Sequence, residues 1–176
     1  MASSSFPKII SGGQTGADQA ALYAARTCGL STGGWAPKDY LTLDGLAPWL
    51  AGYGLQEMPS RNYVARSIKN VDEADATLAF RNHPSSGTDK TIGYALSGKW
   101  RTVDTETYRD GVLHRPLFIV TDILSHQQQL DLVQFIRSHN VKILNVCGHR
   151  EPDKIGKKWT RDVESFLVAV FLHLQQ

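Results

Sequence analysis

Short apolar runs that alternate with segments of helical periodicity are the feature that most constrains how this chain folds. Alternating strands and helices favour a parallel sheet with helices on both faces. We therefore predict a doubly wound α/β fold with a mainly parallel sheet. The expected strands occupy residues 8–11, 32–35, 76–80, 116–121 and 141–146, and the expected helices occupy residues 17–28, 63–73, 88–97, 127–139 and 159–174.

Three stretches fall outside this alternation. Residues 36–61 hold prolines, glycines and aromatic residues without periodicity, and they are expected to form a long loop of functional or mobile character. Residues 98–115 are polar and irregular, which predicts an exposed excursion or a small hairpin. Residues 1–7 are expected to be a flexible N-terminus. With no internal repeat or domain boundary in view, residues 1–176 are predicted to form a single domain.

The composition narrows the classes of partner. A formal net charge of +2 without a basic run argues against nucleic acid. No apolar run reaches the ~18 residues of a membrane helix, and the N-terminal residues do not have the pattern of a secretory signal. Cys28 and Cys147 could pair, but their apolar surroundings predict reduced core residues of a cytoplasmic protein. Surplus apolar positions on the helix at 159–174 predict a homo-oligomer.

The stretch "SGGQTGAD" at residues 11–18 joins the first expected strand to the first helix. Glycines let the backbone turn tightly, and they let an anion approach the peptide N–H groups at a helix N-terminus. The stretch matches neither common phosphate fingerprint, because Ala17 and Asp18 follow Gly16 and the dinucleotide spacing is absent. A phosphate loop and a tight turn without a ligand both remain open at this point.

A second loop has the same context, since Ser86, Gly87 and Thr88 stand between a buried strand and a helix. Two such helix starts at one sheet edge indicate a phosphorylated ligand at a switch point, although simple capping by Ser86 or Thr88 is the alternative. After the last strand, Arg150 could grip a phosphate or a carboxylate, or pair with a surface acid. His149 is expected to be a solvent-exposed loop residue. Neither a metal site nor a serine-type triad is predicted.

Five stretches in a fixed order carry a resemblance: "ISGGQTGADQAAL", "GGWAPK", "YVARSIKNVDEADATL", "SSGT" and "ILNVCGHRE". Together they resemble the molybdenum carrier family, described also as a circularly permuted YpsA-type branch of the SLOG superfamily. The resemblance extends from about Lys8 to the last helix. It implies a Rossmann-like fold that often oligomerises and a nucleotide or nucleotide-derived ligand. Molybdenum cofactor, a pterin with a phosphate, is one candidate ligand.

The resemblance and the loops together give the candidate ligand-binding residues. Tyr63 or Trp35 could stack on a flat ring, with core packing the favoured alternative for Trp35, and Arg66 could add charge or be a solvated surface arginine. The full candidate set is Gly12, Gly13, Gln14, Thr15, Gly16, Asp18, Gly34, Trp35, Lys38, Arg66, Ser86, Gly87, Thr88, Asn145, Gly148 and Arg150.

We therefore predict a protein that binds a phosphorylated nucleotide-like or pterin-like molecule at two glycine-containing helix N-termini. Gly13→Asp is expected to abolish binding while the fold survives. The alternative is a nucleotide-processing enzyme, such as a nucleoside monophosphate phosphoribohydrolase, with Asp18, Asp44 and Glu57 as acid/base candidates. The resemblance speaks against that alternative, because Thr91 stands where the related LOG-type enzymes carry a glutamate. A third alternative is an interaction module whose glycine loops are only turns.

Overall fold

A six-stranded parallel sheet forms the centre of the computed structural model, which describes residues 6–101, 106–108 and 115–176. Every pair of neighbouring strands in this sheet runs parallel, as the alternating sequence pattern predicts. The strand order is β5 (Leu55–Glu57), β2 (Thr32–Ala36), β1 (Lys8–Ile10), β10 (Ile143–Gly148), β6 (Ala76–Phe80) and β9 (Leu117–Val120).

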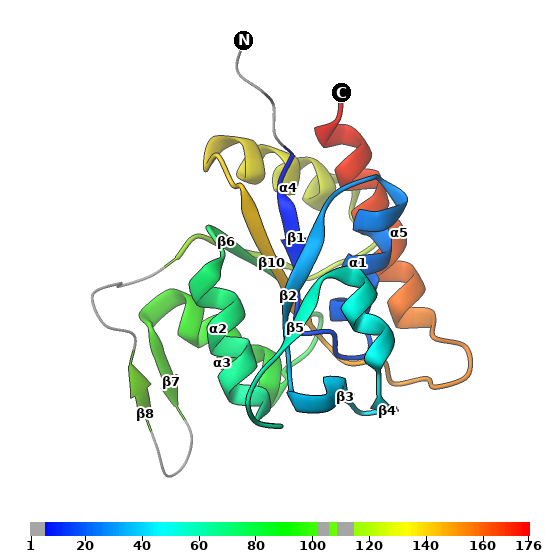
Figure 1. Cartoon of the computed structure of the whole chain (residues 1–176). Helices are drawn as coiled ribbons and strands as arrows, with labels where there is room; N and C mark the ends of the chain where they lie inside the picture. Colours follow the sequence, from blue (N-terminus) through cyan, green and yellow to red (C-terminus); the bar gives the residue numbers. More distant parts are fainter. Residues whose placement is uncertain (1–5, 102–105, 109–114) are drawn as a thin grey trace.

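Helices cover both faces of the sheet, so the predicted doubly wound, Rossmann-like α/β architecture is confirmed (Figure 1). On one face α5 packs against α1 and α4, and on the other face α2 packs against α3. Within the described residues, none of these helices combines the length and the apolar character needed to cross a bilayer. The bounds are α1 Ala17–Thr27, α2 Tyr63–Glu73, α3 Ser86–Ser97, α4 His126–Ser138 and α5 Lys158–Leu174.

The main hydrophobic core lies between the sheet and the helices α1, α4 and α5. Alanines on α1 let α5 approach closely, and the large apolar side chains of α5 fill the space between them, including Phe166, Val170 and Phe171. The apolar positions of α5 are therefore used inside the chain, with Leu172 left half exposed. From the sequence these positions predict a homo-oligomer, but their burial within one chain removes that argument. Cys28 and Cys147 are free thiols, and Cys147 is buried.

The segment 36–61 is not the long loop that its lack of periodicity predicts. Its strand β5 pairs with β2 at the edge of the sheet, and Leu50 and Leu55 pack on Leu22 of α1. A three-residue strand with two exposed polar residues, Gln56 and Glu57, is too short to give a periodic pattern. The other elements of the segment are η1 (Lys38–Tyr40), β3 (Leu41–Thr42), β4 (Gly45–Leu46) and η2 (Pro48–Tyr53).

The polar stretch after α3 contains the small hairpin allowed by the sequence. Strands β7 (Lys99–Arg101) and β8 (Glu106–Tyr108) pair antiparallel. The expectation of an exposed excursion is wrong for Trp100, which is buried against Val71 and Tyr94. Residues 102–105 and 109–114 of the predicted excursion, and residues 1–5 of the predicted flexible N-terminus, lie outside the described residues.

A buried side chain of α2 fixes strand β2 in place. Asn70 accepts a hydrogen bond from the Trp35 N–H at 2.9 Å and donates one to the Trp35 carbonyl at 3.0 Å. Gly34 packs so closely on β1 that a Cβ there would lie 2.2 Å from the Ser11 carbonyl oxygen. The two-point bond therefore joins α2 to β2 at a position where β2 packs closely on its neighbour.

We expect Asn70→Ala to lower the free energy of unfolding by about 1–3 kcal/mol, because it leaves backbone groups of Trp35 without partners. Gln56→Ala, an exposed position on the neighbouring strand, should change it by less than about 0.5 kcal/mol. Urea unfolding followed by circular dichroism measures both values. Equal stability of the two variants would show that the bond does not hold β2.

Candidate functional site

The crevice at the carboxyl ends of the strands lies where the chain path reverses. From β1 the chain leads through α1 to β2 on one side, and from β6 it leads through α3 to β9 on the other side. Strand β10 lies between β1 and β6. Neither the β1–α1–β2 nor the β6–α3–β9 connection covers its carboxyl end. Ligands of doubly wound proteins bind at such a switch point. A cavity of about 650 Å³ opens here.

Both predicted loops contribute to the wall of this cavity, so the structure brings them to one edge of the sheet. The candidate residues that line it are Gln14, Asp18, Arg66, Ser86, Gly87, Thr88, Gly148 and Arg150, and Tyr63 lines it as well. The remaining candidates are not part of the wall: Gly12, Gly13, Thr15, Gly16, Gly34, Trp35, Lys38 and Asn145.

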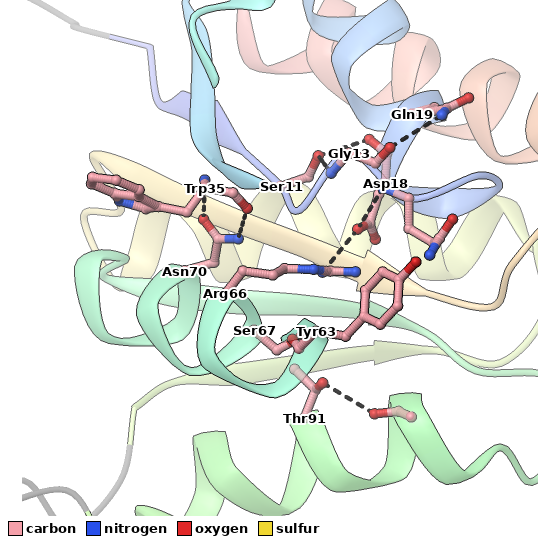
Figure 2. A network of polar contacts seen from close by, with 12 residues as sticks. Ser11, Gly13, Asp18, Gln19, Trp35, Tyr63, Arg66, Ser67, Asn70 and Thr91 are labelled. Carbon is pink, nitrogen blue, oxygen red and sulfur yellow. Dashed lines mark hydrogen bonds and ion pairs between the residues drawn. The ribbon is translucent and has the colours of Figure 1, made fainter. Parts of the chain in front are cut away.

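Trp35 and Lys38 lie away from the cavity. The Trp35 indole N–H donates to Glu73 at 2.8 Å, and the Lys69 ammonium lies 4.4 Å from the centre of the indole ring. Figure 2 shows the Trp35 ring pointing away from Asp18 and Tyr63. Lys38 is exposed. Of the two aromatic residues considered for stacking, only Tyr63 is therefore in position, and Trp35 packs on the outside of α2 instead of in the core.

The first glycine loop uses much of its donor capacity within the chain. Gly13 N–H donates to Ser11 Oγ at 3.3 Å, and Gln14 N–H donates to Asp18 Oδ2 at 3.2 Å. Thr15 N–H donates to Gln14 Oε1 at 2.9 Å. Further along, Ala17 N–H donates to the His149 carbonyl at 3.1 Å. These amides already have acceptors, and one of those acceptors is the carboxylate of Asp18 in the first turn of α1.

The glycines of this loop make room for other parts of the chain. A Cβ on Gly12 would overlap the Arg66 guanidinium, at 1.8 Å from Nη1. Gly13 has φ +72°, and a Cβ there would lie 2.7 Å from Leu50 Cδ1. Gly16 has φ +90° and packs against the backbone at His149. The expectation that a side chain at Gly13 would enter a phosphate site is therefore wrong, because it would enter the apolar cluster around Leu50.

A buried ion pair joins α1 to α2 at the cavity wall. Arg66 Nη1 lies 3.2 Å from Asp18 Oδ2, and both side chains are almost fully buried (Figure 2). Burial raises the pKa of Asp18 above its usual value, while Arg66 and the loop amides oppose that rise. Arg66 is thus not a solvated surface arginine, which is the alternative that the sequence leaves open. Its Nε is buried without a hydrogen-bond partner among the described residues.

The start of α3 differs from the start of α1. Ser85 is the N-cap residue, and its side chain makes no capping hydrogen bond. No acceptor in the described part of the chain takes the N–H groups of Ser86, Gly87 and Thr88. Asp89 instead accepts from Ser85 N–H at 3.3 Å and from Arg81 Nε at 2.5 Å. The first turn of α3 therefore has donors beside the cavity that no described residue uses.

His149 is buried, which overturns the expectation of a solvent-exposed loop residue. Its Nε2 accepts from the N–H groups of Asn82 at 3.2 Å and His83 at 3.4 Å, and its ring stacks on His83 with centroids 3.8 Å apart. Burial lowers the pKa of His149, and the neutral ring carries its proton on Nδ1 because Nε2 is an acceptor. Nδ1 has no partner among the described residues.

The other sequence candidates serve the framework. Asn145 is buried and donates to Thr77 Oγ1 at 3.3 Å. Asp44 and Glu57, the further acid/base candidates, are exposed and lie outside the cavity wall. Within the described residues, no three His, Cys, Asp or Glu side chains are grouped as a metal site would require. Wall residues that sequence reasoning did not select include His83, Lys90, Trp100 and Trp159.

The family assignment follows from comparison with known proteins. The family model described as circularly permutated YpsA SLOG matches residues 9–171. The chain belongs to this family. A solved structure from Syntrophus aciditrophicus SB, bearing the name "Putative molybdenum carrier protein", is similar to this family member at 28% identity and a TM-score of 0.70. The match covers 98% of this chain and 96% of that one. No curated protein matches the chain.

For this family member we expect Gly13→Ala to lower the free energy of unfolding by roughly 2–4 kcal/mol, since positive φ disfavours a Cβ and Leu50 must move. Gly93→Ala is the matched control, because a Cβ at this helical position meets nothing within 4 Å. It should raise stability by about 0.5–1 kcal/mol. Denaturant unfolding compares them, and a Gly13→Ala protein as stable as the wild type would contradict the packing seen at Leu50.

Proposed function

We propose that the chain binds a phosphorylated nucleotide-like or pterin-like small molecule in the cavity above β10, with its phosphate at the first turn of α3. The observation that carries this proposal is the set of N–H groups at Ser86, Gly87 and Thr88, which have no acceptor in the described part of the chain and belong to residues that line a cavity of about 650 Å³. That volume is within the range of ligand sites in proteins.

The charges on either side of the cavity support this orientation. Lys90 and Arg150 line the cavity together with the first turn of α3, whose helix dipole also favours an anion. Asp18 lies in the wall formed by the start of α1. A phosphate would be repelled by that carboxylate, and the amides around it are occupied. The phosphate is therefore assigned to α3, and the ring of the ligand to the side of Asp18.

Unpaired polar atoms around the cavity also support a bound ligand. Four wall residues each carry a buried side-chain nitrogen without a partner among the described residues: Gln14 Nε2, Arg66 Nε, Trp100 Nε1 and His149 Nδ1. Each unsatisfied buried group costs about 1–3 kcal/mol. A polar ring that accepts hydrogen bonds from some of them would remove that cost, and the face of Tyr63 offers a surface on which such a ring can stack.

The name of the similar Syntrophus protein bears on the choice of ligand. Molybdenum cofactor is a pterin with a phosphate, so it presents both parts for which the cavity has a place. A nucleotide presents the same two parts. Both remain candidates for this chain, and the donors at α3 together with Asp18, Gln14 and Arg66 would hold either one.

Nucleotide hydrolysis is the weaker candidate, because the carboxylates at the cavity are engaged in the framework. Thr91, at the position of the glutamate in LOG-type enzymes, donates its hydroxyl to the Gly87 carbonyl at 3.1 Å. Glu151 accepts from both the N–H and the hydroxyl of Thr160 at 2.7 Å, at the start of α5. Asp18 is held by Arg66 and Gln14. We therefore expect binding without release of a free base.

The test places a charge where the phosphate is assigned. Gly87 lies in the first turn of α3, and a Cβ there meets nothing within 4 Å, so Gly87→Asp should fold. We expect Gly87→Asp to weaken binding of nucleoside monophosphates by about tenfold or more, since charge-assisted hydrogen bonds contribute about 1.5–3 kcal/mol and like charges repel. Calorimetric titration measures the affinities.

Gly87→Asn is the matched control, because it adds nearly the same volume without the charge. It should bind monophosphates more tightly than Gly87→Asp does, and the corresponding nucleosides should bind both variants alike. Monophosphate affinity unchanged in Gly87→Asp would remove the phosphate from α3.

A homo-oligomer and a cytoplasmic location remain part of the proposal. The free thiols of Cys28 and Cys147 support the location. Exposed apolar side chains at Leu43, Leu46 and Trp49 support association, because exposed apolar surface favours a partner. We expect light scattering at micromolar concentration to give a mass above the 19.5 kDa of one chain. A strict monomer would refute this expectation.

A further inference from the structure

His149 follows β10, and its imidazole holds the turn that leads into α3. Nε2 accepts from the N–H groups of Asn82 at 3.2 Å and His83 at 3.4 Å. The backbone adds a third bond, because His149 N–H donates to the Phe80 carbonyl at 3.3 Å. Among the described residues, the N–H groups of Asn82 and His83 have no other acceptor. The path from β6 to Ser85, the N-cap residue of α3, is therefore tied to β10 through this imidazole.

The two side-chain bonds exist only while the imidazole is neutral. A backbone N–H can only donate, so Nε2 must be without a proton to accept from two of them. A proton on Nε2 would face both N–H groups, and both bonds would be lost. His149 is only 5% exposed, so little water reaches the imidazole to replace these partners. Protonation of His149 would therefore release the turn.

The titratable and charged groups that act on the imidazole come from the turn and the start of α3. Burial lowers the pKa of His149 most, and the His83 ring, stacked on it with centroids 3.8 Å apart, lowers it further. Asp89 favours the charged imidazole, but its carboxylate is paired with Arg81, Nε to Oδ1 at 2.5 Å, and Arg81 disfavours that charge. The Trp159 ring of α5, with its centroid 5.9 Å from that of His149, carries no charge. These surroundings keep the imidazole neutral.

We infer that neutral His149 is the positioning residue of the phosphate site, and that the site is lost when the imidazole gains a proton. His149, Asn82 and His83 line the same cavity as the first turn of α3. The bonds to Nε2 fix the backbone just before that turn, so they also fix where its first N–H groups lie. This inference rests on the proposed function, because it concerns the phosphate assigned to α3.

A histidine beside a phosphate could instead act as a cation, and that role has the opposite pH dependence. A bound anion favours the charged imidazole, so a cationic role would make the affinity rise as the pH falls. Positioning by the neutral imidazole makes the affinity fall, because the groups that face Nε2 are donors. Below the pKa of His149 the affinity should decrease about tenfold for each pH unit, since only the neutral fraction binds.

The experiment measures the affinity of one phosphorylated probe for the full-length chain from about pH 8 to about pH 5, a range that contains the usual histidine pKa of about 6.5. The probe is the tightest binder among AMP, GMP, CMP, UMP and neopterin monophosphate, titrated by calorimetry. Histidine ring signals in NMR spectra give the pH at which His149 protonates, and circular dichroism shows at which pH the fold is lost.

Two variants of His149 separate acceptance from titration. His149→Gln places an amide oxygen about where Nε2 lies, and it cannot titrate. Its spectrum also lacks the His149 signal, which assigns that signal in the wild type. His149→Leu has no acceptor at all. Dividing the wild-type affinity by that of His149→Gln at each pH cancels the protonation of the phosphate itself, whose second pKa is about 6.

At pH 8 we expect His149→Gln to bind within about threefold of the wild type and His149→Leu to bind at least tenfold more weakly, because two N–H groups lose their acceptor in the leucine variant. The ratio of wild-type to His149→Gln affinity should fall once the imidazole protonates. His126→Gln is the control, since His126 is exposed on α4 and is not part of the cavity wall. It should keep the wild-type affinity and pH profile.

Each other outcome overturns part of the proposal. A ratio that rises in acid would identify His149 as a cationic phosphate ligand. A ratio that stays constant through the protonation of His149, or an imidazole that stays neutral until the fold is lost, would overturn the loss of the site in acid. A His149→Leu protein that binds like the wild type would overturn the positioning role, and if this variant does not fold, the ratio for His149→Gln decides. Failure of every probe to bind the wild type at millimolar concentration would overturn the proposed function, and the inference with it.

Discussion

The carboxylate of Asp18 organises the edge of the sheet on which the site depends. It accepts a hydrogen bond from the Gln14 N–H, and this bond stabilises the turn of the glycine loop. It also pairs with Arg66 of α2. The Asp18 backbone carbonyl also accepts the Ser11 hydroxyl at 2.9 Å, which ties the end of β1 to the helix that follows. One residue thus fixes the loop, the start of α1 and the position of α2. The anion bound by the amides of the glycine loop is therefore a carboxylate of the chain itself, that of Asp18.

Such an arrangement is difficult to explain by stability alone. Taking two charges out of water costs several kcal/mol per ion, and a buried pair often recovers no more than that cost. Among the described residues, Arg66 Nε also has no partner, and neither do Gln14 Nε2 and His149 Nδ1 at the same cavity. Buried polar groups without partners are rare in proteins and call for a reason. A ligand that meets these atoms gives one reason for all of them, which is why they favour a binding site over a set of turns.

The fold could be predicted from the sequence where its pattern is strong, and the errors have physical causes. Buried strands such as β6 carry mostly apolar residues on both faces, so the run itself marks the strand. Strand β5 has one buried residue, and its place at the sheet edge comes from Leu55 packing on Leu50 and Leu22, a contact that no local pattern records. The position of the cavity followed from the order of strands and helices, because loops after parallel strands meet at one edge.

The roles of the loop residues could not be predicted in the same way. A glycine is equally necessary where a ligand approaches and where another part of the chain does, and the sequence does not distinguish the two cases. Gly13 and Gly16 make room for Leu50 and for the backbone at His149, whereas the space at Gly87 is open. The sequence alone does not predict the burial of His149, because that burial depends on His83 and on the packing of β10 against β6.

The N-termini of α1 and α3 differ in charge and in hydrogen bonding, so the two sides of the cavity are not equivalent. Both helices begin at the carboxyl ends of parallel strands, and by the usual rule each would attract an anion. At α1 that field already acts on Asp18, which lies in the first turn and is held by Arg66. At α3 no described residue accepts from the first-turn amides of Ser86, Gly87 and Thr88, and the acid of that turn, Asp89, pairs with Arg81. The hydrogen bond from Arg81 keeps the pKa of Asp89 below its usual value, so this carboxylate stays ionised and paired. The ligand that we propose, with one anionic end and one polar ring, would meet two unlike walls, and only one orientation would place its negative charge away from Asp18.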